Sequence, residues 1–330
     1  MTNDSINICQ VSLARDISLV KENYRNFTKF YQNLKFHIIC PKKDVSLFQE
    51  SFNFKNCKII NEDTVLSLSD FRIFFNELSA NLTYKDSFEQ RLSWYYQQVL
   101  KISYVIDFID ENNEKIIIWD ADTIILKRIE FFNKNESNNF GTLFEFHRAY
   151  FLTIKRIFDI LPPVFISSLT QFISISLEDN HILKKRLNNF IEKKSMNTSE
   201  WISKIVLRAV FDEHKTFNGS MFSEYELIGI SKILDNKFKQ KPLFTLRSGL
   251  DGKLSNFQKI LCKFFNIYHV TYEHSHPNEF SKDMLKRQQN IVRFFRIILN
   301  DAIKFYLRNL RYQFDYYISS LKKRRGGREV

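Results

Sequence analysis

The sequence predicts an α/β protein with a mostly parallel sheet flanked by helices, followed by a helical C-terminal region. Short apolar runs rich in β-branched residues alternate with amphipathic stretches in the N-terminal half, which is typical of strands joined by crossover helices. Glycine and proline are scarce, at 7 and 5 of 330 residues, which disfavours an all-β sandwich rich in tight turns. Residues 279–321 contain neither, so a long helix is expected there.

The first elements are predicted to be three strands joined by helical crossovers. Residues 6–13 form the first buried strand, and a helix follows over residues 16–30. Residues 34–40 and 57–60 are predicted as the second and third strands because both are short and apolar. This order implies parallel strands with right-handed crossovers.

The next segment carries two acidic residues at the end of a strand. Residues 88–109 are predicted as one helix, and residues 115–119 (KIIIW) form the clearest strand in the chain. The strand ends directly at Asp120 and Asp122, and another strand is expected over 123–127. Ligands of open α/β sheets bind beyond the carboxyl ends of the strands, so both aspartates lie where a site is expected.

Beyond residue 140 the pattern is mixed. Strands are expected over residues 140–146 and 242–249, and helices over 178–193, 199–210 and 221–235. A length of 330 residues fits one large α/β domain with a helical extension.

Composition and charge narrow the class of partner. Lys and Arg number 49 against 37 Asp and Glu, and the net charge is +12. A basic protein attracts nucleic acid, anionic membranes or phosphorylated substrates. The excess is concentrated at the end of the chain, where residues 322–325 are KKRR.

Cysteines and apolar runs indicate a cytosolic protein. None of the four cysteines, Cys9, Cys40, Cys57 and Cys262, forms a CxxC pair, so we expect reduced thiols and no zinc site. The N-terminus has no signal-peptide pattern. The apolar stretch 157–177 contains an Asp and two Pro residues and is a poor candidate for a membrane span.

The pair Asp120 and Asp122 is the strongest chemical feature. Two carboxylates at the end of a buried strand can bind one Mg²⁺ or Mn²⁺ ion, which prefers oxygen ligands and shares them with substrate phosphates. Such an ion neutralises a diphosphate leaving group. A DxD triplet alone is more often a solvated turn, but four apolar residues, Ile116 to Trp119, lead directly into this one.

Several short motifs around this pair resemble bacterial glycosyltransferases of the GT-A fold, in particular a family found in O-antigen and capsule gene clusters. A Gln-Gln-x-x-Lys helix precedes the DxD strand in that family, as Gln97, Gln98 and Lys101 do here. The remaining matches, in chain order, are Glu145, His147, Tyr150, Phe151, Thr170, Gln171, Ser223, Glu224, Tyr225, Glu226 and Gly229. The resemblance covers roughly residues 5–235, and the chain after about residue 240 has no clear counterpart.

The resemblance implies a metal-dependent, inverting transfer of a hexose or N-acetylhexosamine from a nucleotide-sugar donor to a lipid-diphosphate-linked glycan, in surface polysaccharide (lipopolysaccharide or capsule) synthesis. Residues 1–275 would form the transferase domain and residues 276–330 a basic amphipathic helical region. The donor would be held by Ser12, Arg15, Asp16, Arg91, Gln97, Gln98, Lys101, Trp119, Asp120 and Asp122. His147, Gln171 and Tyr225 would bind the acceptor. Arg91 has an equally acceptable interpretation as a plain surface residue.

An inverting transfer needs a base for the acceptor hydroxyl. Glu224 or Glu226 would supply it, although acids early in a helix also simply favour the helix dipole. Glu145 is a third candidate, or else part of an ordinary solvated turn.

A further metal ligand is proposed from the histidines near the end of the transferase region. Either His274 or His276 would supply it, as a late histidine does in many GT-A enzymes. The alternative is a surface loop that happens to contain histidines.

The C-terminal helix is predicted to be amphipathic and basic. One side would carry Ile291, Phe295, Ile298, Ala302 and Phe305, and the other Arg293, Arg296, Lys304, Arg308 and Arg311. Such a helix can lie on an anionic membrane, or pack its apolar side on the catalytic domain. The first interpretation predicts a cytoplasmic protein bound peripherally to the inner face of the cytoplasmic membrane.

Two other functions compete with sugar transfer. A nucleic-acid-binding protein would fit the charge, but no RNP pair, KH loop or zinc finger is found, and no nucleic acid is expected. A phosphotransferase or nucleotidyltransferase would use the same acidic pair but needs a phosphate-binding glycine loop, and neither GxxxxGK[ST] nor GxGxxG occurs.

Overall fold

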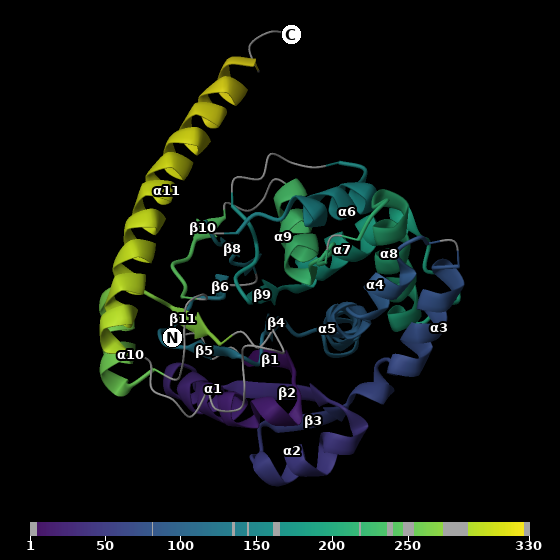
Figure 1. Ribbon diagram of the computed structural model, residues 1–330, viewed down its shortest axis with the longest axis horizontal. Coiled ribbons are helices and arrows are strands. Elements are labelled where there is room, and N and C mark those ends of the chain that lie inside the picture. Colours follow the sequence, from purple (N-terminus) through teal and green to yellow (C-terminus); the bar gives the residue numbers. More distant parts are fainter. Residues whose placement is uncertain are drawn as a thin grey trace.

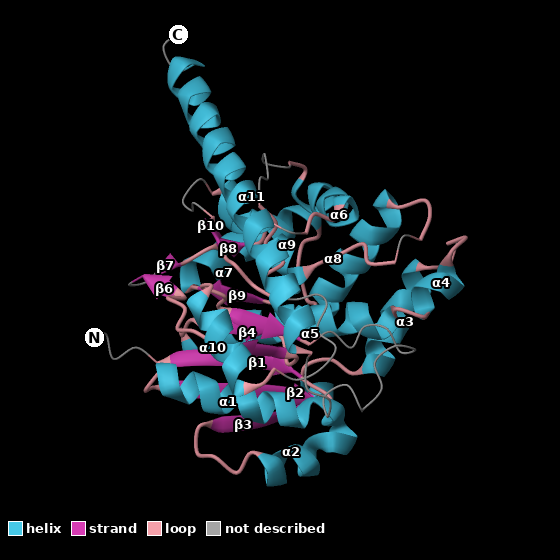
Figure 2. Ribbon diagram, turned by 60° about the vertical axis from the view of Figure 1, so that its left-hand side comes forward, coloured by secondary structure: helices cyan, strands magenta, loops and turns pink. Residues whose placement is uncertain are grey.

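A computed structural model describes residues 5–80, 82–133, 136–143, 145–160, 166–217, 219–235, 240–246, 254–272 and 290–326, with side chains up to residue 311. Its central sheet has five strands, in the order β3-β2-β1-β4-β9. These are β1 (Ile6–Val11), β2 (Leu34–Cys40), β3 (Cys57–Asn61), β4 (Ile116–Trp119) and β9 (Phe172–Ile175). The first four are parallel and β9 is antiparallel to β4. The predicted fold class, a mostly parallel sheet flanked by helices, is confirmed (Figures 1 and 2).

Both faces of the sheet are buried, which explains why its strands are continuously apolar. Successive side chains of a strand point to opposite faces. One apolar core therefore contains Ile8, Ile38 and Ile117, and the other contains Cys9, Ile39 and Ile118. The first core is closed by α1 (Ile17–Phe30) and α2 (Val45–Ser51). Short 3₁₀ turns at Ala14–Asp16, Lys42–Asp44 and Glu62–Thr64 lie between strands and helices.

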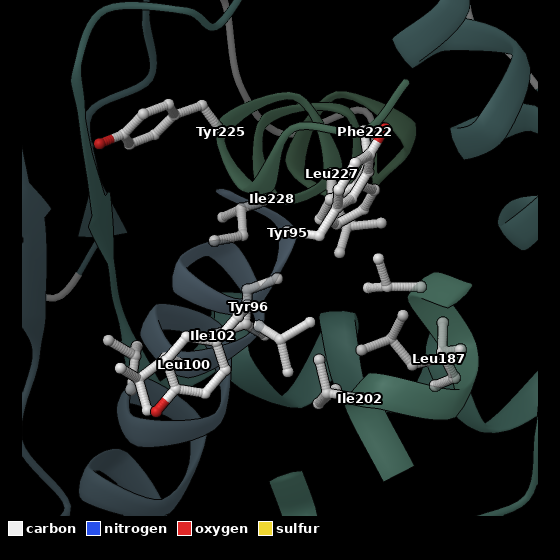
Figure 3. Close-up of a cluster of buried hydrophobic side chains, with 14 of the residues drawn as sticks. Tyr95, Tyr96, Leu100, Ile102, Leu187, Ile202, Phe222, Tyr225, Leu227 and Ile228 are labelled. Atoms are coloured by element: carbon white, nitrogen blue, oxygen red, sulfur yellow. The ribbon is translucent and has the colours of Figure 1, made fainter. Parts of the chain in front are cut away.

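The second core is the larger one and is built around α5 (Leu92–Asn112), with 13 buried residues. The helices packed around it are α3 (Leu68–Leu78), α4 (Lys85–Glu89), α6 (Arg148–Phe158), α7 (Leu177–Phe190), α8 (Thr198–Glu213) and α9 (Glu224–Leu234). Figure 3 shows side chains of α5, α7, α8 and α9 meeting in this core, while Tyr225 extends to the side, away from the other labelled residues. The side chain of Tyr225 therefore points out of this core and can contact the residues at the end of β4.

A third apolar core joins the end of the chain to the segment after Asp122. It contains residues of β5 (Thr123–Ile125), β11 (His269–Thr271), α10 (Asn256–Phe264) and α11 (Ile291–Gly326). β11 pairs antiparallel with β5. The remaining short strands are β6 (Phe132–Asn133), β7 (Glu136–Ser137), β8 (Phe140–Gly141) and β10 (Lys241–Pro242).

Several elements differ from the sequence-based expectation. The helix expected over 88–109 is divided between α4 and α5, and the strand expected over 140–146 is reduced to the two residues of β8. The sequence analysis did not predict α3, α6, α10, β6, β7, β9 or β11. The strand expected over 242–249 extends partly outside the described residues, as does the helix expected from residue 279.

The face of α11 that packs on the body is rotated relative to the prediction. Phe294, Ile298, Ala302 and Phe305 are buried, whereas Ile291 and Phe295 are 46% and 42% exposed. Within the described residues, no helix combines the length and the apolar character needed to cross a membrane.

Candidate functional site

A cavity of about 570 Å³ opens where the strands β1 and β4 end. This is within the volume range typical of small-molecule sites. The predicted site residues that line it are Ser12, Arg15, Asp16, Arg91, Gln97, Gln98, Lys101, Asp120, Asp122, Glu145, His147, Gln171, Glu224 and Tyr225. They come from the segment that follows β1, from α5 and the residue before it, from the turn after β4, from the loops before α6 and β9, and from the start of α9. The fold thus gathers residues more than 200 positions apart. His274 and His276 lie outside the described residues.

Lys101 bridges two carboxylates of the cavity, those of Asp120 and Glu224. Its Nζ donates to Oδ1 of Asp120 at 2.6 Å and to Oε1 of Glu224 at 2.7 Å. The hydroxyl of Tyr225 donates to the same Oδ1 of Asp120 at 2.6 Å. Asp120 Oδ2 receives no hydrogen bond from the described residues, so it remains available to a ligand.

Burial and charge act against each other in this cluster. Burial disfavours the charged form of Lys101, but the carboxylates of Asp120 and Glu224 outweigh it and raise the pKa of Lys101. Burial, together with repulsion from Asp120, raises the pKa of Glu224, while Lys101 opposes that rise. Burial and the same two carboxylates raise the pKa of Tyr225. Lys101 is therefore a fixed cation and Tyr225 a fixed hydrogen-bond donor.

The first turn of α9 presents Glu224 to the cavity. Ser223 is the N-cap residue, and its hydroxyl accepts from the backbone N–H of Glu226. The side-chain carbonyl of Gln98 accepts from the backbone N–H of Glu224 at 3.0 Å. Within the described residues, only Oε1 of the Glu224 carboxylate accepts a hydrogen bond from another side chain. Oε2 is buried and has no hydrogen-bond partner there. An unsatisfied buried oxygen on a residue that lines a cavity can accept a hydrogen bond from a ligand.

Glu226 differs from its predicted role in catalysis. It is fully buried and lies outside the cavity lining. Oε1 accepts hydrogen bonds from the hydroxyl of Ser167 and from the backbone N–H of Ser168. Burial, opposed by these two hydrogen bonds, raises the pKa of Glu226 to about 7. Its geometry is that of a residue which positions the loop before β9.

Trp119 also differs from its predicted contact with the donor. It is fully buried because its ring fills the core, stacked on Phe172 at 5.0 Å between ring centroids. Its indole N–H donates to the carbonyl of Thr123 at 2.7 Å. The backbone N–H of Thr123 in turn donates to the carbonyl of Asp120 at 3.1 Å. Trp119 therefore holds the turn that carries the two aspartates.

Gln171 lies beside this turn. Its carbonyl accepts from the backbone N–H of Asp120 at 2.9 Å, and its φ of +58° is in the left-handed region, where a non-glycine residue is strained. Its Oε1 is buried without a hydrogen-bond partner in the described part of the chain. Gln171 and Glu224 thus each place an unsatisfied buried acceptor on a residue that lines the cavity.

The loop before α6 supplies the more accessible groups. The imidazole of His147 lies 3.8 Å from the carboxylate of Glu145, with side chains that are 52% and 23% exposed. The His147 ring also lies 4.9 Å from the ring of Tyr150, another cavity residue. These groups form a polar and aromatic part of the cavity wall.

Trp94 and Ser220 are among the lining residues that the sequence did not predict as part of the site. The guanidinium of Arg91 lies 5.5 Å from the centre of the Trp94 ring and donates to the hydroxyl of Ser220 at 2.8 Å. Trp94 is one turn N-terminal to Gln98 on α5, so helical spacing from the Gln-Gln-x-x-Lys motif would have found it. No local signal marks Ser220.

The donor set fits a magnesium- or manganese-type ion. Mg²⁺ uses one or two protein carboxylates and completes its shell with water and substrate phosphate oxygens, and both Asp120 and Asp122 line the cavity. Within the described ranges, no group of three His, Cys, Asp or Glu side chains is arranged as a metal cage. The chemistry available is thus that of an ion shared with a substrate.

Comparisons with known proteins yield similar structures but no matching sequence family. No protein-family model and no curated protein sequence matches the chain. Mouse xyloside xylosyltransferase 1 is 10% identical, with 84% of this chain and 99% of that chain covered and a TM-score of 0.42. The galactosyltransferase LgtC, solved with donor and acceptor sugar analogues, is 10% identical, with 89% and 95% covered and a TM-score of 0.37.

The bifunctional glycosyltransferase WbbM is 8% identical, with 92% of this chain and 52% of that chain covered and a TM-score of 0.37. These solved structures are all glycosyltransferases.

Proposed function

We propose that this protein is a metal-dependent, inverting glycosyltransferase that moves a hexose or N-acetylhexosamine from a nucleotide-sugar donor to a glycan acceptor. The observation that carries the proposal is the contact of Lys101 with both Asp120 and Glu224 in a cavity at the carboxyl end of β4. It links a metal-binding carboxylate to a candidate base through one buried cation.

Charge favours a divalent cation in this cavity. Asp120, Asp122 and Glu224 carry three carboxylates, and Lys101 offsets one of them. Asp120 Oδ2 and the carboxylate of Asp122 would hold the ion. When bound, Mg²⁺ or Mn²⁺ would stabilise the negative charge of the departing nucleoside diphosphate.

Glu224 is the proposed base. An acceptor hydroxyl would donate to the unpartnered Oε2 and give up its proton there as its oxygen attacks the anomeric carbon. The bond from that carbon to the diphosphate oxygen breaks, and its electron pair leaves with the diphosphate. Attack from the face opposite the leaving group inverts the anomeric configuration. A pKa raised by burial brings Glu224 closer to the range in which a base works well near neutral pH.

The other lining residues divide between the two substrates. Ser12, Arg15 and Asp16 follow β1 and would hold the nucleotide. His147, Gln171 and Tyr225 would bind the acceptor sugar. A lipid-diphosphate-linked acceptor in bacterial surface polysaccharide synthesis, and residence on the inner face of the cytoplasmic membrane, belong to the same proposal.

The test is a screen of nucleotide sugars with purified protein, with and without Mn²⁺ or Mg²⁺. We expect metal-dependent hydrolysis or transfer from one donor, lost with a chelator and lost in Asp120→Asn and in Asp122→Asn. Asp110→Asn is the matched control, because Asp110 is bonded to Asn180 and Lys184 outside the cavity. Full activity of both cavity variants in excess chelator would refute metal dependence.

A further inference from the structure

A stripe of exposed apolar side chains runs along α11. It consists of Val292, Phe295, Leu299, Ile303, Tyr306 and Leu310, which we call the outer stripe. Their spacings of three and four residues put them on one side of a helix with about 3.6 residues per turn. Their exposed fractions range from 42% to 75%, so none is needed to complete a core.

The helix is already held by a different set of side chains. Phe294, Ile298, Ala302 and Phe305 are 0% to 7% exposed and belong to the third core. The ring of Phe305 stacks on that of Phe244 at 4.8 Å between centroids. α11 therefore has two apolar sides, one packed on the body and one left open.

The neighbouring helix α10 repeats this feature. Phe257, Ile260 and Phe264 are 51%, 61% and 80% exposed and are also spaced three and four residues apart. α10 packs beside α11. In Figure 1 it lies next to the N-terminal end of α11, opposite the end marked C. Apolar side chains gathered in this way mark a binding surface, whereas scattered ones do not.

Charge identifies the partner. Between residues 290 and 311, α11 carries five Lys or Arg residues and a single acid, Asp301. The basic residues Arg293, Arg296, Lys304 and Arg311 are exposed on the side next to the outer stripe. A helix with an exposed apolar side and an adjoining cationic side lies in the interface of an anionic bilayer.

We propose that the outer stripe of α11, with the exposed apolar residues of α10, docks this protein on an anionic lipid bilayer. A second copy is a poorer occupant, because pairing along the stripe would bring the adjoining cations of both helices together.

The docked helix would be coupled to the cavity through the third core. Ile124 and Leu126, which follow Asp122, belong to the same core as Phe294 and Ile298. The backbone N–H of Tyr272 donates to the carbonyl of Asp122 at 2.9 Å. The inference rests on the proposed function only for the purpose of docking, namely to hold the cavity near a lipid-linked acceptor.

Flotation of the full chain with vesicles tests the docking surface without any sugar substrate. We expect binding to phosphatidylglycerol-containing vesicles that weakens as salt rises, and little binding to pure phosphatidylcholine. The triple variant Leu299→Gln, Ile303→Gln, Leu310→Gln should weaken binding by roughly tenfold or more, since burial of three large apolar side chains is lost. The variant Arg293→Gln, Arg296→Gln, Lys304→Gln should lose the preference for anionic lipid by a similar factor.

The matched control replaces three exposed apolar residues on other helices, Leu47→Gln, Ile73→Gln and Leu177→Gln, and should float like wild type. Equal flotation of the stripe variant and wild type overturns the inference. The inference is also overturned if wild type does not bind vesicles and forms a dimer that the stripe variant converts to a monomer. Donor hydrolysis is measured separately, so loss of activity with intact flotation counts against the proposed function and not against the docking surface.

Discussion

Lys101 is the residue on which the candidate site depends. It is 7% exposed, and a buried ammonium is tolerated only when it is paired and hydrogen-bonded. Asp120 and Glu224 provide that pairing, and Lys101 in turn keeps two buried or half-buried carboxylates close together without strong repulsion. The same arrangement leaves one oxygen of each carboxylate, Asp120 Oδ2 and Glu224 Oε2, without a donor among the described residues.

The first prediction distinguishes the three candidate bases. Glu224→Gln should lower turnover by about 10²–10⁴-fold while donor binding persists, because the amide oxygen still accepts from Lys101 but cannot take a proton. Glu226→Gln and Glu145→Gln should retain most of the turnover. Turnover and donor affinity are measured separately, by initial rates and by calorimetry. A large loss in Glu145→Gln with normal turnover in Glu224→Gln would move the base to Glu145.

At the scale of elements, α9 and the loop before β9 meet through a glycine. A Cβ at Gly229 would lie 2.0 Å from Oγ and 2.6 Å from Cβ of Ser168. The helix and the loop can approach this closely only because residue 229 has no side chain. One turn earlier, Glu226 holds the same loop through Ser167 and Ser168. The glycine thus permits the contact that fixes the start of α9 against the sheet.

The second prediction follows from that contact. Gly229→Ala should lower the free energy of unfolding by roughly 1–3 kcal/mol through overpacking, and should lower activity by displacing the first turn of α9. Adding Ser168→Gly should restore part of both, since the clashing side chain is removed. Urea unfolding and turnover are the measurements, with Ser231→Ala on the same helix as the control. Equal stability of Gly229→Ala and wild type would show that the loop moves without cost.

At the scale of the whole molecule, two buried groups on different elements make stability depend on pH in opposite directions. Burial, with the charges of Lys58 and Lys35, lowers the pKa of His37 from 6.5 to about 4. Its stabilising contribution is therefore fully present above pH 6.5 and lost as pH falls toward 4. Burial raises the pKa of Glu226 from 4.5 to about 7, so its contribution is fully present below pH 4.5 and lost as pH rises through 7.

The third prediction is that the two effects largely cancel in wild type between pH 4.5 and 6.5. Replacing one group should expose the other. In His37→Gln the free energy of unfolding should fall as pH rises, and in Glu226→Gln it should rise, each by up to roughly 3 kcal/mol relative to wild type. Chemical unfolding at several pH values measures this, and titrations shared by all three proteins drop out of the differences. Parallel profiles for the three proteins would contradict the assignment.

The sequence by itself determined the sheet strands and the acidic end of β4. Strand β2 begins and ends where its apolar run does, and β1, β3 and β4 lie within two residues of expectation. This worked because strands buried on both faces are short, apolar and β-branched, so their signal is local. The site positions from Ser12 to Tyr225 that line the cavity were named from the same local signals and the motif resemblance.

Only the tertiary structure decided what those residues do to one another. Elements far apart in the chain determine the burial of Trp119 and Glu226. They also bring Lys101 into contact with Asp120 and Glu224, and Arg91 into contact with Ser220. On α11, helical spacing predicted an amphipathic helix, but two apolar stripes satisfy that spacing. Which stripe packs is set by the shape of the third core, since a repeat of three and four residues fixes the period of a helix and not its rotation.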